Sequence, residues 1–309
     1  MPGRSPVFKT QGNTNLFTMD KPRIFLLSLL IFFCPGCISE DLSKCDRGFS
    51  LELSYTGDGS DEIFHEKICH VMLYVFDGED LCVDLRPATD AEIAARTVRF
   101  SNDYPEGDYR VICLGNPHDT KTTDPEGCGC DEMRFADPAW FEGGEIASND
   151  SLYYAAADIT IARGRSGRQT ARFASSHYKI YVEVAGFDPA AVTPVLRMHG
   201  VCPATDFENR ACGDPMTYHL QTSPYDARSG RVFSRFNIMR RIGDDTGIEL
   251  LDADGGHMAA VNLSEFLAEH DEIDLSKHEV LIPVSFRFKG VGVEVSVPDW
   301  YIEDVKPEI

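Results

Sequence analysis

Apolar and polar side chains alternate along many short stretches of this chain. Every second residue from Phe49 to Tyr55 is apolar, and a longer β-rich run with the same alternation covers residues 68–76. Successive side chains of a strand point to opposite faces, so this pattern predicts half-buried β-strands.

Further strands are expected along the whole chain, with turn residues between them. Residues 77–78, 252–256 and 289–290 have the composition of hairpin turns. The segment from Thr89 to Glu92 has the form of a capping box and predicts a short helix, and residues 262–269 suit a second one. The other expected strands cover residues 81–85, 109–113, 152–162, 178–184, 195–201, 231–239, 248–251, 280–288 and 291–297.

The order of these elements predicts the fold class. The helices that a parallel α/β fold needs between its strands are absent, so we expect an all-β fold with one or two short helices. A flexible basic segment, residues 163–168, divides the strands into two halves. We therefore expect two tandem antiparallel β-sandwich domains, over residues 48–166 and 167–309. Residues 116–150, rich in glycine, proline, aspartate and cysteine, predict a long irregular excursion.

The first 36 residues differ from the rest. Residues 1–18 are polar, whereas Met19 opens a short basic segment that leads into an apolar run of ten residues, 24–33. A bilayer span needs about 20 residues, so this run fits the apolar core of a secretory signal peptide. We expect translation to start at Met19, and residues 1–36 to comprise a leader and a lipoprotein signal peptide.

A cysteine follows this apolar run closely. Gly36 precedes Cys37, and a small residue before a cysteine in this place resembles a lipobox, whose cysteine receives a diacylglycerol and, after cleavage, an N-acyl chain. Cleavage after Gly36 would leave Cys37 as the lipidated N-terminus and residues 37–47 as a tether. Cys34, where leucine is usual, and Pro35 depart from the pattern, so an ordinary signal peptide cleaved nearby is the alternative.

Charge and cysteine content narrow the choice of partners. The formal net charge is −21, and such a surface repels nucleic acid and anionic lipid headgroups. Eight cysteines remain beyond the signal and the lipid site, an even number that permits disulfides in an exported chain. Cys202 and Cys212 share one loop and are a possible disulfide pair, and free buried cysteines are the alternative.

The sequence carries no recognisable catalytic or metal-binding pattern. It lacks a nucleophile elbow, a P-loop, a dinucleotide fingerprint and an HExxH helix. Cys128 and Cys130 are not at the spacing of a zinc knuckle, and no histidine spacing completes a tetrahedral site. We therefore expect no enzyme activity, no metal, no cofactor other than the covalent lipid, and no small-molecule substrate.

Several segments taken together resemble the fimbrial anchor lipoproteins of Bacteroidales, the fimbrillin-associated family of major and minor fimbria anchors. These segments are CISEDLSKC at residues 37–45, GFSLELSY at 48–55, VMLYVFD at 71–77, YKIYVEV at 178–184 and the closing strand at 291–300. The resemblance covers nearly all of the expected mature chain. It implies that the two sandwiches are transthyretin-like.

The resemblance also implies a function. The protein would be lipid-anchored in the outer membrane, exposed at the cell surface, and would tie the base of a fimbria to the cell and limit its length. Fimbrial shaft subunits would be its partners, joined by strand addition to a neighbour's sheet, with residues 49–55 and 291–302 as the candidate contacts. A fimbrial tip subunit or surface adhesin that binds a glycan or host protein is the alternative, and acylation of Cys37 separates the two.

Overall fold

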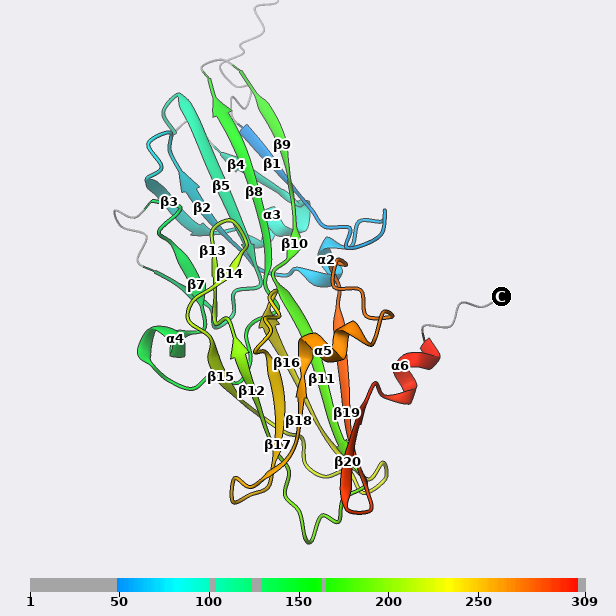
Figure 1. Ribbon diagram of the computed structural model, residues 1–309. Helices are drawn as coiled ribbons and strands as arrows, with labels where there is room; N and C mark the ends of the chain where they lie inside the picture. The colour runs from blue at the N-terminus through cyan, green and yellow to red at the C-terminus, as the bar shows by residue number, and fades with distance from the viewer. Residues whose placement is uncertain (1–48, 101–103, 124–128, 163–164, 305–309) are drawn as a thin grey trace, which may run out of the picture. The chain divides into compact units, whose positions relative to one another are not determined.

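The computed structural model describes residues 49–100, 104–123, 129–162 and 165–304, and most of its regular structure is strand. The predicted all-β class is confirmed, and the strands form two sandwiches and a small third sheet (Figure 1). The two predicted helices are present as α3 and α5, and three further short ones accompany them. The helices are α2 (Phe64–Lys67), α3 (Asp90–Ala95), α4 (Pro138–Glu142), α5 (Leu263–Ala268) and α6 (Asp299–Asp304).

The first sandwich packs a three-stranded sheet on a five-stranded one. In the smaller sheet, β1 (Phe49–Ser54) lies between antiparallel β4 (Thr97–Phe100) and parallel β9 (Gly167–Arg172). Alternate apolar residues, Leu51 and Leu73 among them, fill the space between the sheets. The larger sheet contains, in spatial order, β10 (Ala174–Ser175), β8 (Tyr153–Ile161), β5 (Gly107–Gly115), β2 (Val71–Phe76) and β3 (Cys82–Pro87).

Strands β9 and β10 show that the expected domain boundary is wrong. Residues 167–172 pair with β1, and residues 174–175 pair with β8. The first sandwich therefore continues to Ser175, and the second begins with His177. The basic segment that suggested a boundary connects β8 to β9 within the first sandwich, because a flexible composition marks a connection without saying which sheets it joins.

The second sandwich packs two four-stranded sheets around a separate core. Its first strand, β11 (His177–Ala185), lies between antiparallel β16 (Arg231–Met239) and parallel β19 (Leu281–Lys289), as β1 lies between its own neighbours. Each sandwich thus contains one parallel pair among its described strands, which the predicted antiparallel sandwiches did not include. One sheet is β16, β11, β19 and β20 (Gly292–Ser296). The other is β15 (Met216–Leu220), β12 (Val195–Val201), β17 (Gly247–Leu251) and β18 (His257–Asn262).

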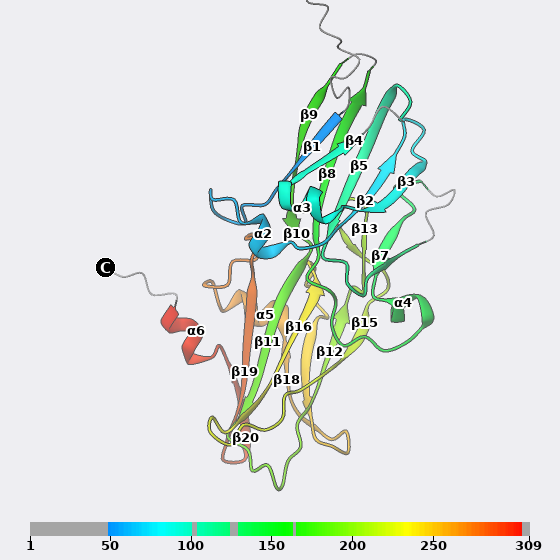
Figure 2. The same cartoon turned by 180° about the vertical axis from the view of Figure 1, so that it is seen from behind.

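The third sheet draws its strands from both halves of the chain. Its order is β14 (Ala211–Cys212), β13 (Ala204–Asp206), β7 (Arg134–Ala136) and β6 (Lys121–Thr122), so the predicted excursion is only partly irregular. Figures 1 and 2 show β7 and β13 beside the five-stranded sheet. The ring of Phe207 lies 5.1 Å from that of Tyr74 and 5.6 Å from that of Phe135, between centroids. The third sheet therefore buries the outer face of the five-stranded sheet.

Candidate functional site

The predicted lipid site, Cys37 with cleavage after Gly36, lies outside the described residues, as does the tether up to residue 47. Lipid attachment therefore stays a prediction. Within the described ranges, no helix is both long and apolar enough to cross a membrane. In the same ranges, no three His, Cys, Asp or Glu side chains are grouped so that they would hold a metal ion.

Cys202 and Cys212 do not form the possible disulfide, and both are free thiols. Cys212 of β14 lies opposite Ala204 of β13, not opposite Cys202. Two residues of extended chain span about 6.6 Å, and this offset adds to the distance between the strands. A disulfide needs Cα atoms roughly 4.4–6.8 Å apart, so the strand register works against the pairing.

A partly buried carboxylate joins the two sandwiches, which lie within one compact unit over residues 46–309. Glu279, just before β19, accepts hydrogen bonds from Tyr55 Oη at 2.6 Å and Tyr153 Oη at 2.9 Å, both of the first sandwich. It also accepts one from Lys179 Nζ at 2.6 Å, in the second sandwich. Burial alone would raise the pKa of Glu279, but the hydrogen bonds from Lys179 and Tyr55 outweigh it and lower the pKa to about 2.

A buried histidine lies where the chain passes from one sandwich to the other. The Nδ1 atom of His177 lies 2.9 Å from the carbonyl oxygen of Leu152, to which it donates, and the residue is only 2% exposed. Burial lowers the pKa of His177 to about 4. The imidazole is therefore neutral at neutral pH. In acid it either stays unprotonated or gains a proton as the connection around it opens.

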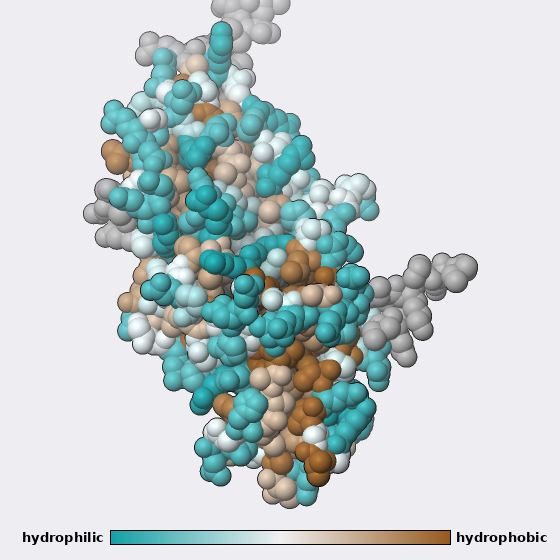
Figure 3. Space-filling model, in the orientation of Figure 1, coloured by the Kyte–Doolittle hydropathy of each residue, from teal (hydrophilic) through white to brown (hydrophobic). Residues whose placement is uncertain are grey.

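The second sandwich has an open apolar side along β18 and β20. These strands end their sheets and contact each other. Val293 and Val295 of β20 and Met258 and Val261 of β18 pack against the core but are only partly buried. Val291, in the β19–β20 turn, is fully exposed. Figure 3 shows apolar surface over this part of the second sandwich.

The other candidate contact segment, residues 49–55, is not an open edge. It contains β1, whose two edges are paired with β4 and β9. The backbone groups of β1 are thus already bonded inside its own sheet. The structure thus offers no free edge at this segment, and its contact with a neighbouring subunit stays a prediction. The sequence pattern of a strand does not say whether it lies in the middle or at the end of a sheet.

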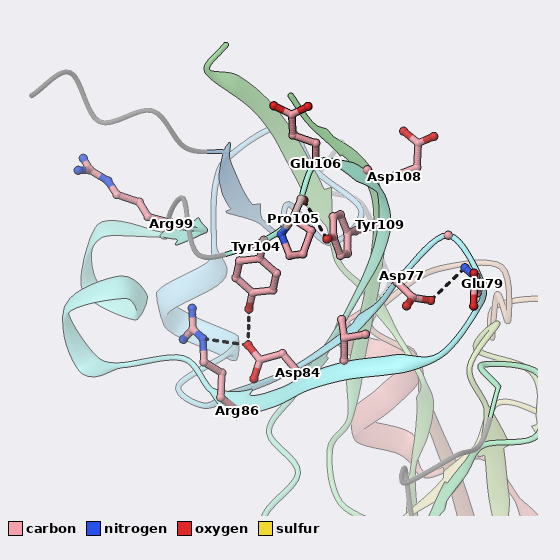
Figure 4. Close-up of a pocket in the computed structure, with 13 residues that line it drawn as sticks. Asp77, Glu79, Asp84, Arg86, Arg99, Tyr104, Pro105, Glu106, Asp108 and Tyr109 are labelled. Atoms are coloured by element: carbon pink, nitrogen blue, oxygen red, sulfur yellow. Dashed lines mark hydrogen bonds and ion pairs between the residues drawn. The ribbon is translucent and has the colours of Figure 1, made fainter. Parts of the chain in front are cut away.

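A cavity of about 740 Å³ lies in the first sandwich beside the β2–β3 hairpin (Figure 4). On its β3 side, Asp84 accepts a hydrogen bond from Tyr104, and the Nε atom of Arg86 lies 3.9 Å from Asp84. The two terminal nitrogens of Arg86 bind the two carboxylate oxygens of Glu92 at 2.9 and 3.0 Å. The ring of Tyr109, whose hydroxyl donates to a backbone carbonyl at 2.9 Å, adds an aromatic wall.

The lining of this cavity is predominantly acidic. Because Arg86 is already paired with Glu92, the carboxylates dominate the charge of the cavity. The ionisable side chains are the carboxylates of Asp77, Glu79, Asp84, Glu106 and Asp108 and the guanidinium groups of Arg86 and Arg99. Sequence reasoning missed both the cavity and the Glu279 cluster, because their members come from segments far apart along the chain.

The comparison with known families decides the identity. Proteins described as the fimbrillin-A associated anchor proteins Mfa1 and Mfa2 match the chain over residues 42–306. The chain belongs to this family. The predicted resemblance is therefore confirmed, and the description of the family names anchor proteins rather than enzymes. No curated protein sequence matches the chain.

Solved structures show the same fold for this fimbrillin-A associated anchor protein. Mfa2 of Porphyromonas gingivalis, a fimbrial anchor protein, is 13% identical with a TM-score of 0.61, covering 78% of this chain and 90% of its own. A candidate adhesin from Bacteroides ovatus is 15% identical with a TM-score of 0.67, covering 82% and 93%. A candidate polysaccharide-binding protein from Bacteroides thetaiotaomicron is 12% identical with a TM-score of 0.64, covering 82% and 98%. At these identities the likeness shows the fold alone.

Proposed function

We propose that this protein is an outer-membrane lipoprotein, acylated on Cys37, that anchors the base of a fimbria to the cell and limits the length of the fimbria. The family match over residues 42–306 carries the proposal. It begins directly after the segment that contains the predicted lipid site, so the matched chain would stand at the membrane surface. The acyl chains would hold it there, because each CH₂ group buried in the membrane contributes about 0.8 kcal/mol to binding.

Contact with a shaft subunit would use β20. This strand ends its sheet, and its valines and Val291 of the adjoining turn leave apolar surface in contact with solvent. An incoming strand would bond to the free backbone edge and cover these side chains. The proposal therefore keeps the second of the two candidate segments and drops the first.

The lipid is tested by metabolic labelling with a palmitate analogue, together with a count of the fimbriae that cells retain. Cys37→Ala should abolish the label and release fimbriae into the medium. Cys45→Ala is the matched control, because this cysteine lies in the expected tether, outside the lipobox, and should leave label and fimbriae unchanged. A wild-type protein without label would overturn the lipid anchor and favour the tip adhesin. Label loss with fimbriae still attached would leave a lipoprotein of another function.

The strand contact is tested by cysteine crosslinking in assembled fimbriae. Glu294→Cys places a thiol on the exposed edge strand β20, whereas Glu52→Cys places one on β1, between two paired strands. We expect a crosslink to a shaft subunit from position 294 and none from position 52. A crosslink from position 52 alone would mean that β1 leaves its sheet during assembly, and the absence of both would contradict strand-mediated contact.

A further inference from the structure

Strand β3 presents an exposed and apolar sheet edge. Within the described ranges, β2 is the one strand that pairs with residues 82–87, whereas Leu81, just before the strand, is bridged to Gly129. Leu81, Val83 and Leu85 are 43%, 48% and 39% exposed, and they are three of the six large apolar side chains that the described chain exposes. Apolar surface is thus concentrated at one edge, where natural proteins usually place protective charges or proline. Proline occupies only the last position of this strand, Pro87.

The charged residues of β3 do not protect this edge. Asp84 and Arg86 lie on the face of the sheet that β2 turns toward the sandwich core. There Tyr104 binds Asp84, and Glu92 binds Arg86. Both charged groups therefore have partners on the inner face of the sheet, and they do not repel a strand that approaches from the side.

The cavity beside this edge combines apolar walls with acidic groups. Val83, Tyr104 and Tyr109 line it, and so do Glu79 and Asp108. In Figure 4, the two tyrosine rings lie side by side, with Glu79 across from them and Asp108 beyond Tyr109. An apolar stem would pack on such walls while its cationic end reached the carboxylates, and aromatic faces also attract cations. Lysine and arginine side chains have this combination.

We propose that β3 and this cavity bind an extended segment of a partner protein. The segment adds a strand to the five-stranded sheet along residues 82–87, covers Leu85 and inserts a lysine or arginine side chain into the acidic cavity. Backbone hydrogen bonds supply affinity in this mode of recognition, and the pocket supplies specificity. The site is distinct from β20 and does not depend on the lipid or on fimbrial assembly.

A phage library of random dodecapeptides, panned against the full chain, tests the proposal. We expect enriched peptides to carry one lysine or arginine with apolar, β-branched residues at alternate positions. A library that yields no binders, or binders without a basic residue, overturns the proposal. Binding of a neutral oligosaccharide that the cavity variants abolish, without peptide enrichment, would assign the cavity to a glycan and likewise overturn it.

Matched variants connect the enriched peptides to this site. Glu79→Lys reverses one charge of the cavity, and Val83→Lys places a competing ammonium group in it. Each should weaken binding at least about tenfold, since like charges brought together at an interface cost several kcal/mol. Asp254→Lys is the control, because Asp254 occupies the corresponding position of the β17–β18 hairpin, with its N–H bound to Asp252 at 2.9 Å as that of Glu79 is bound to Asp77 at 3.0 Å. Equal affinity of all three variants for the peptides contradicts the assignment.

Hydrogen exchange on the wild-type chain gives a measurement that does not depend on how the variants fold. An added strand bonds to the free N–H groups of β3. Bound peptide should therefore slow exchange within residues 82–87 and leave residues 292–296 unchanged. Slower exchange in β20 instead would place the peptide on the other open edge and overturn the proposal.

Discussion

The two sandwiches share a strand plan but finish their sheets differently. In each, the first strand lies between one antiparallel and one parallel neighbour, β1 in the first and β11 in the second. The first sandwich has its larger sheet covered on the outside by the third sheet. The second leaves the core-facing residues of β18 and β20 partly exposed. One repeated plan thus supports a closed face in one sandwich and an open side in the other.

The closed face depends on chain from both halves. Phe207, beside β13, packs on Tyr74 and Phe76 of the first sandwich. In return Ile146, which precedes the boundary, is buried in the core of the second sandwich. Each half therefore contributes apolar side chains to a cluster of the other half, Phe207 to the cluster on the outer face of the five-stranded sheet and Ile146 to the second core. The core between the two sheets of the first sandwich comes from the first half alone.

The largest expected effect comes from removing Phe207, which takes away the first of these contributions. The side chain is 1% exposed, and a buried phenylalanine replaced by alanine typically costs about 3–5 kcal/mol of the free energy of unfolding. Phe207→Ala should lose that amount in urea denaturation. Phe141→Ala, at a position that is 41% exposed, should change stability by less than about 0.5 kcal/mol. Equal stability of the two variants would show that the third sheet does not stabilise the first sandwich.

The next effect is a loss of stability in acid at the connection between the sandwiches. The pKa of His177 is about 4 in the folded protein and about 6.5 when unfolded, so the unfolded chain binds more protons between these values. The stabilising contribution is complete above pH 6.5 and is lost as pH falls toward 4. From pH 7 to about pH 4.5 this amounts to about 2 kcal/mol.

A comparison of variants isolates this titration from that of the carboxylates. His177→Asn keeps a donor for the carbonyl of Leu152 but cannot be protonated, so its free energy of unfolding should fall less steeply with acid than that of the wild type. His257→Asn, at an exposed position of β18, should follow the wild type. Parallel curves for His177→Asn and the wild type would mean that His177 is not the group that responds to acid.

The sequence predicted those features that depend on local pattern. Alternation placed β1, β2 and β11, and the capping box of α3 is present, with Thr89 and Glu92 bonded reciprocally. The parallel partner of each first strand is about a hundred residues away in the chain, and no local pattern encodes such a pairing. For the same reason the Glu279 cluster and the cavity beside β3 were missed. The exposed Val83 and Leu85 gave no signal in sequence, because a strand at the end of a sheet shows the same alternation as a central one.

The smallest effect compares the two sandwiches at equivalent turns. In the β2–β3 hairpin, Asp77 Oδ1 accepts the N–H groups two and four residues later, both at 3.0 Å. In the β17–β18 hairpin, Asp252 Oδ1 does the same at 2.9 and 2.6 Å. Asp77→Ala and Asp252→Ala should each cost about 1 kcal/mol in urea denaturation, and the asparagine variants should restore most of it. A clearly larger cost at Asp77 would show that this turn is also stabilised by packing against the cavity. Equal costs would mean that the two turns are locally equivalent, so that only their surroundings make one hairpin part of a binding edge and leave the other a simple chain reversal.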